Sequence, residues 1–83
     1  MRSRIPSTQA LRALECFARH GTVWGAADEM NLTRSAVSHQ LRLLERELGL
    51  RLFERAGNRI ALTPRGRAFA EDVRAALSSI AGS

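Results

Sequence analysis

Residues 31–45 read NLTRSAVSHQLRLLE, and this stretch decides the fold. Its apolar residues recur at helical intervals into the following turn, so they share one narrow arc of a helix: Val37, Leu41, Leu44 and Leu48. The opposite side is polar and basic, and it collects Arg34, Ser35, Ser38, His39, Arg42 and Arg46. A core uses only the apolar side. The polar side therefore either contacts a partner or is a solvated surface.

The composition narrows the choice of partner. The chain has 83 residues and a formal net charge of +5, and every basic residue in it is an arginine. The planar guanidinium group fits phosphates and guanine edges. Excess positive charge indicates nucleic acid most often, a membrane surface less often, and sometimes only solubility. The length allows one small domain with aliphatic helix packing, near the lower limit for a single core.

The sequence also indicates a cellular compartment. A single cysteine, Cys16, excludes an internal disulfide and fits a reducing environment. No apolar stretch follows the basic residues near Met1, so no signal peptide is expected, and no apolar run reaches the length of a membrane span. These features predict a cytoplasmic protein, or the N-terminal piece of one.

Three helices are expected before residue 50. Each follows a hydroxyl residue that can cap free N–H groups, and glycine follows the first and third. The first expected helix starts at the signal Pro6-Ser7-Thr8 and runs to His20. A short second helix follows Thr22 and reaches Met30, and the third follows Thr33 and runs to Leu48. The paired alanines Ala26 and Ala27 predict a close approach between the second helix and a neighbour, because small side chains let two backbones come near.

After Gly49 the pattern changes from helical to extended. Two short strand-like runs, 51–55 and 59–62, flank good turn residues and predict a β-hairpin. Thr63 and Pro64 then form a helix start. The apolar residues of this fourth helix step by four, three and four, as in a heptad seam: Phe69, Val73, Ala76 or Leu77, and Ile80. The seam predicts pairing with a second copy of the chain, and packing onto its own domain is the alternative.

Helix, short helix, tight turn, helix and hairpin is the layout of a winged helix-turn-helix, mainly α with a small β-hairpin. We expect this domain over 1–63 and a linker helix for dimerisation over 64–83. A recognition helix must enter a major groove about 12 Å wide, so its outward side has to be polar. Arg34 and Ser35 lie in the first turn, which usually points at base edges, whereas Arg42 lies where phosphate is expected.

The run AADEMNLTRSAVSHQLRLLERELGLRLFER, followed by LTPRG, closely resembles the N-terminal domain of LysR-type transcriptional regulators. The resemblance covers essentially the whole chain. Its strongest parts are the Ala-Ala pair, SHQ at 38–40, LE at 44–45, ELG at 47–49, LFER at 52–55 and LT at 62–63. Many residues at fixed spacing make this signal far more specific than a lone short motif.

The resemblance implies a bacterial, cytoplasmic regulator, associated with the nucleoid when bound, that binds double-stranded promoter DNA at inverted repeats. It implies a homodimer paired through the linker helix, or a tetramer of such chains. It also implies a small-molecule effector that is bound only by a C-terminal domain absent from this chain. The implied DNA contacts are Thr22, Thr33, Arg34, Ser35, Ser38, His39, Arg42, Arg55, Asn58 and Arg59. The implied dimer contacts are Phe69, Val73, Ala76, Leu77 and Ile80.

The sequence departs from the family pattern at a few positions. Trp24 stands where a small hydroxyl residue is common, and Gly25 stands where a basic or polar residue often sits. A phosphate contact at this point would need a substitute donor, such as the Trp24 indole N–H. Arg65 replaces a residue that is usually small, and it faces either DNA or solvent.

Other interpretations of the same residues exist. Cys16 and His20 stand four apart on a helix, but one cysteine and two histidines fall short of a closed zinc site, so we expect no metal and no cofactor. His39 has no nucleophile or carboxylate pair at a readable spacing, which argues against an enzyme. Two alternatives to DNA binding stay open: a winged helix that binds an acidic protein, and an oligomerisation module built on the last helix.

Overall fold

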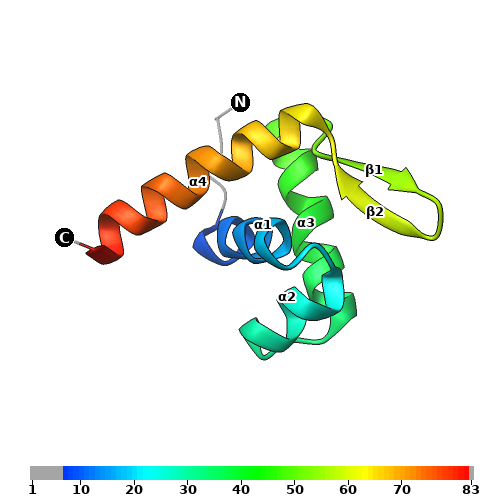
Figure 1. The fold of residues 1–83 in the computed structure, drawn as a ribbon, viewed down its shortest axis with the longest axis horizontal. Coiled ribbons are helices and arrows are strands. Elements are labelled where there is room, and N and C mark those ends of the chain that lie inside the picture. The colour runs from blue at the N-terminus through cyan, green and yellow to red at the C-terminus, as the bar shows by residue number, and fades with distance from the viewer. Residues whose placement is uncertain (1–6, 83) are drawn as a thin grey trace.

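The computed structural model describes residues 7–82, with side chains described up to residue 79. Its elements are α1 (Thr8–His20), α2 (Val23–Met30), α3 (Arg34–Leu48), β1 (Phe53–Ala56), β2 (Arg59–Leu62) and α4 (Pro64–Gly82). The first three helices pack together, the β1–β2 hairpin projects from one end, and α4 runs back past α1 (Figure 1). This arrangement confirms the predicted winged helix-turn-helix with its additional C-terminal helix.

The boundaries of the first three helices follow the predicted start and stop residues. The hydroxyl groups of Ser7, Thr22 and Thr33 each accept a hydrogen bond from the backbone N–H three residues later. Ser7 is thus the N-cap residue of α1. Gly21 and Gly49 end α1 and α3 with φ of 78° and 67°, a left-handed conformation that glycine adopts without a steric penalty.

One hydrophobic core joins the helices to the base of the hairpin. Its largest fully buried side chains are Leu14, Val37, Leu41, Leu44 and Leu52. The predicted apolar side of α3 is therefore confirmed, although its last member, Leu48, is only half-buried. Ala26 and Ala27 are buried where α2 packs against α1 and α3, as the paired alanines predicted.

The first half of α4 belongs to this core. Ala70 and Val73 are only 4% and 6% exposed, because α4 crosses α1. Val73, which is predicted on the pairing face, packs into its own domain, as in the alternative interpretation of the seam. The core thus continues past residue 63, where the sequence suggested a division between domain and linker. In the described part of the chain, no helix is both long and apolar enough to cross a bilayer.

The other residues of the predicted seam have different surroundings. Phe69 and Leu77 are half-buried against the core, and Ala76 is exposed. The side chain of Ile80 lies outside the described residues. The seam is therefore split between residues that complete the domain and residues that remain on its surface.

The hairpin is shorter at its start than predicted. Its antiparallel ladder runs from Phe53 opposite Leu62 to Ala56 opposite Arg59 and closes through a two-residue turn. The run was expected to begin at residue 51. The two residues before β1 make other backbone contacts instead, and these contacts fix the hairpin to the helices.

Those contacts hold Leu52 from both sides. One oxygen of the Glu45 carboxylate accepts hydrogen bonds from the backbone N–H groups of Leu52 and Phe53, at 2.8 and 3.0 Å. From the other side, Thr63 donates its hydroxyl to the Arg51 carbonyl at 2.6 Å and its backbone N–H to the Leu52 carbonyl at 2.9 Å. We call this set of hydrogen bonds the Leu52 clamp. It ties the base of the wing to α3 and to the start of α4.

Gly66 tests the clamp, because a Cβ at this position would collide with the Leu52 carbonyl oxygen. Gly66→Ala is expected to lower the free energy of unfolding by about 3 kcal/mol, since backbone atoms must shift to relieve the overlap. Urea denaturation followed by circular dichroism measures the loss. Arg65→Ala, at the exposed neighbouring position, is the control and should change stability by less than about 0.5 kcal/mol. Equal stability of the two variants would contradict the close approach of α4.

Candidate nucleic-acid interface

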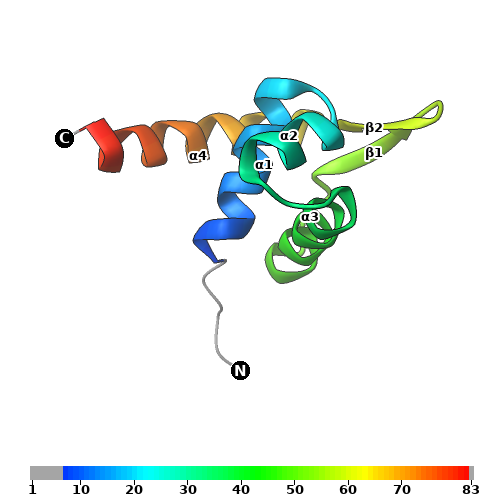
Figure 2. The same cartoon turned by 90° about the horizontal axis from the view of Figure 1, so that it is seen from below.

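The polar side of α3 is bare. We call this surface the recognition face and define it as Thr33, Arg34, Ser35, Ser38, His39 and Arg42. All six are exposed except Ser38, which is half-buried. In both views α4 extends away from α3 toward the C-terminus, so it does not cover this face (Figures 1 and 2). The recognition face is therefore accessible to a partner.

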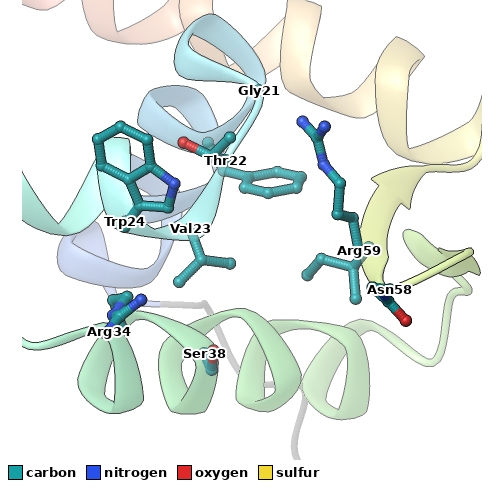
Figure 3. A pocket seen from close by; sticks show the side chains of 10 residues that line it. Gly21, Thr22, Val23, Trp24, Arg34, Ser38, Asn58 and Arg59 are labelled. Carbon is teal, nitrogen blue, oxygen red and sulfur yellow. The ribbon is translucent and has the colours of Figure 1, made fainter.

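An open groove of about 600 Å³ lies between the start of α2, the recognition face and the hairpin (Figure 3). Its apolar floor is made by Phe17, Val23 and Ile60. Its polar lining comes from three separate segments: Thr22 and Trp24, Arg34 and Ser38, Asn58 and Arg59. This α2–wing groove brings together five of the ten residues predicted to contact DNA, although they lie up to 37 positions apart in the printed sequence.

A second hollow, of about 340 Å³, lies on the other side of the contact between α3 and the hairpin. Ser38, Arg42 and Arg55 line it, and Ser38 also lines the α2–wing groove. Arg51 lines this hollow as well, and the sequence analysis missed it because the residue stood in an expected strand. The remaining predicted contacts, Thr33, Ser35 and His39, line neither hollow and lie exposed along α3.

In the part of the chain that the structure describes, the arginines around the recognition face have no carboxylate partners and can therefore bind an anion. Among the described residues, none of Arg34, Arg42, Arg55 and Arg59 pairs with a carboxylate. Arg19, by contrast, forms ion pairs with two glutamates, Glu15 on α1 and Glu29 on α2. Unpaired guanidinium groups can make charge-assisted hydrogen bonds to phosphate without first breaking an internal pair. The surface around the recognition face is thus suited to a polyanion.

An ion network holds the C-terminal half of α2 against α1. Glu29 accepts hydrogen bonds from Arg19 at 2.8 and 3.0 Å, and it lies 2.7 Å from the His20 ring nitrogen. Arg19 also pairs with Glu15 on its own helix. Hydrogen bonds from Arg19, and then the contact with His20, lower the Glu29 pKa to about 2. The sequence analysis had not identified this network, which helps to set α2 and hence one wall of the α2–wing groove.

Cys16 is a buried residue of this network. Its Sγ lies 3.6 Å from a Glu29 oxygen, and burial, followed by the charge of Glu29, raises the pKa of the thiol. The thiol therefore stays protonated and packs as a small core residue. Within residues 7–82, no group of three or more histidine, cysteine, aspartate or glutamate side chains could hold a metal ion.

The sequence of this chain matches one protein-family model over most of its length. The model of bacterial regulatory helix-turn-helix proteins of the lysR family matches residues 8–67. This chain belongs to the LysR family. The glycine cleavage system transcriptional activator of Escherichia coli (strain K12) is 39% identical over 80 residues. That match covers 96% of this chain and 26% of the relative, so the chain spans only a part of the length of the curated relatives it matches.

Solved structures of DNA-binding domains have the same fold as this chain. The BenM DNA-binding domain in complex with benA site 1 DNA superposes with a TM-score of 0.84 at 28% identity, over 92% of this chain and 85% of that one. The CbnR DNA-binding domain in its DNA complex superposes with a TM-score of 0.80 at 33% identity, over 92% and 86%. The chain is thus a LysR-type helix-turn-helix DNA-binding domain of a transcriptional regulator, a class that is not enzymatic.

Glu29→Gln is expected to lower the melting temperature at pH 7 but not near pH 2. The Glu29 pKa is about 2 in the folded chain against an ordinary value of 4.5, so the stabilisation is complete above about pH 4.5 and is lost as the pH falls toward 2. Thermal unfolding across this pH range measures the difference from wild type. The control is Glu71→Gln, which removes an exposed pair with Arg74 within α4 and should cause a smaller shift. A Glu29→Gln effect that persists unchanged at pH 2 would contradict the assignment.

Proposed function

We propose that this domain binds double-stranded DNA in a sequence-specific manner at bacterial promoters. The observation that carries the proposal is the bare recognition face, bordered on both sides by hollows whose arginines have no carboxylate partner. The complexes of BenM and CbnR with DNA support it, because this chain has the same fold at 28% and 33% identity.

The surface suggests a division of labour. Arg34 and Ser35 open α3, the end of a recognition helix that usually faces base edges, and Ser38 and His39 follow one turn later. We propose that these four residues discriminate between bases. Arg42, Arg55, Asn58, Arg59 and the cap residues Thr22 and Thr33 would contact the sugar-phosphate backbone, which positions the protein but carries no direct sequence information.

Two arginine variants separate these roles. Arg34→Ala should weaken binding to the cognate site by about 1–3 kcal/mol and relax preference at one base position. Arg59→Ala should weaken binding to all duplexes alike and reduce the slope of log K against log salt by about one. Fluorescence-anisotropy titrations on cognate and random duplexes at several salt concentrations measure both. Identical behaviour of the two variants would contradict the division of labour.

The proposed function itself is tested by selecting bound duplexes from a random pool. Sequence-specific binding predicts an enriched motif, which also gives the symmetry and spacing of the site. A winged helix that instead binds an acidic protein would enrich no motif and would show no salt-sensitive binding to duplex DNA.

We also propose that two copies pair through α4. With Val73 assigned to the core, the proposed pairing surface is Ala76 together with the outward parts of Phe69 and Leu77, and Ile80 further along. A two-fold pair would present two recognition faces to an inverted repeat, with the half-site spacing set by the α4 pair. When one copy is bound to its half-site, its partner is held near the second half-site at a high effective concentration.

Adjacent alanines test the pairing surface. Ala76 and Ala75 are both exposed in the single chain, so a glutamate at either position leaves the core intact. They point about 100° apart around α4, and only Ala76 lies on the seam. Ala76→Glu should convert dimers to monomers in sedimentation velocity, whereas Ala75→Glu should not. Dimers that survive Ala76→Glu would remove this side of α4 as the interface.

A further inference from the structure

Trp24 is the one large apolar side chain that is exposed among the described residues. Its exposed fraction is 63%, and it is the only tryptophan in the sequence. An exposed indole contributes little to a core and leaves a large apolar ring in water. Tryptophan is enriched at interfaces because its ring is apolar and its N–H is a hydrogen-bond donor. The position therefore suggests contact with a partner.

The surroundings of Trp24 indicate which partner. Trp24 lies in the first turn of α2 and lines the α2–wing groove, with Arg59 on the opposite wall. Figure 3 shows the indole nitrogen on the ring edge that is turned toward the groove, and the Arg59 side chain reaching along the wing side. Thr22 lies between them, and its oxygen accepts the Gly25 N–H at 3.1 Å, which leaves its own O–H free to donate.

These three groups share one chemical property. The indole and the guanidinium are donors only, and the Thr22 hydroxyl has a donor left to offer. A phosphodiester strand is the complementary ligand, since it presents acceptor oxygens and negative charge along its length. Within the helical residues of the first turn of α2, 23–26, Trp24 is the only side chain with a donor. Gly25 provides none, and a Cβ there would approach Thr22 Oγ1 to 2.8 Å and His20 Cβ to 2.9 Å.

We propose that Trp24 and Arg59 clamp one sugar-phosphate strand of the DNA in the α2–wing groove. The inference rests on the proposed function and turns the possible phosphate contact of the Trp24 indole N–H into a two-sided site with Arg59. Trp24 donates its indole N–H to a phosphate oxygen and covers the adjacent deoxyribose with its ring, while Arg59 supplies the charge. Because the indole is neutral, its contact releases no counterion, and salt does not weaken it as it weakens the arginine contacts.

The test compares wild type with Trp24→Phe and Trp24→Ala in duplex titrations over a range of salt. Trp24→Phe keeps the ring but loses the donor, so it should weaken binding about fivefold, and Trp24→Ala should weaken it about twentyfold. Both losses should be equal on selected and random duplexes. The slope of log K against log salt should stay at the wild-type value, whereas the matched variant Arg59→Ala should lower it by about one. Thermal melts verify that each variant is folded.

The same residue provides a direct optical readout. Acrylamide should quench the Trp24 emission efficiently in the free chain, and saturating duplex should protect it. If wild type binds duplex DNA while Trp24 stays equally quenched and both Trp24 variants bind as well as wild type, the clamp is wrong and the proposed function stands. If Trp24→Phe lowers the salt slope, the clamp is also wrong, because the lost contact is then ionic. If wild type binds no duplex, both proposals fail.

Discussion

The position of the wing depends on two partly buried backbone N–H groups that need acceptors. The chain leaves α3, turns at Gly49 and starts a strand at Phe53, and the N–H groups of Leu52 and Phe53 face α3 instead of a third strand. The Glu45 carboxylate accepts both, and a buried N–H without an acceptor would cost about 1–3 kcal/mol. An isolated two-stranded hairpin is marginal in water, so this carboxylate supplies what a wider sheet would otherwise provide.

The Leu52 clamp also determines where the arginine side chains of the hairpin lie. With its base fixed at Leu52, the hairpin lies beside α3, and Ser38 lines both hollows between the two elements. Arg59 then lies on the α2 side, and Arg55 on the other side. A wing held less firmly would spread these side chains over many positions, with a larger loss of entropy on binding. Rigid placement of the wing thus fixes where Arg55 and Arg59 lie relative to the arginines of α3.

Local chemistry made most of the fold predictable. Hydroxyl caps, left-handed glycines and the apolar arc of α3 depend on neighbours in sequence, and each was predicted correctly. The start of the hairpin and the Glu29 network were not, because each depends on a residue seven or more positions away. Glu45 shows the limit most clearly: as one of several acids near the basic side of α3 it reads as a solvated residue, and only the path of the chain after Gly49 brings the two N–H groups to it.

The same distinction applies to α4, whose heptad spacing predicts either pairing with a second copy or packing onto its own domain. Ala70 and Val73 face the core, and Ala76 faces outward, so the helix is a rigid part of the domain along its first half. Its start is joined to the wing through Thr63 and the close approach at Gly66. Any partner that pairs along the outward side of α4 would therefore orient the wing and α3 as one body. The spacing of two recognition faces would then follow from helix packing, without a flexible connection to average it out.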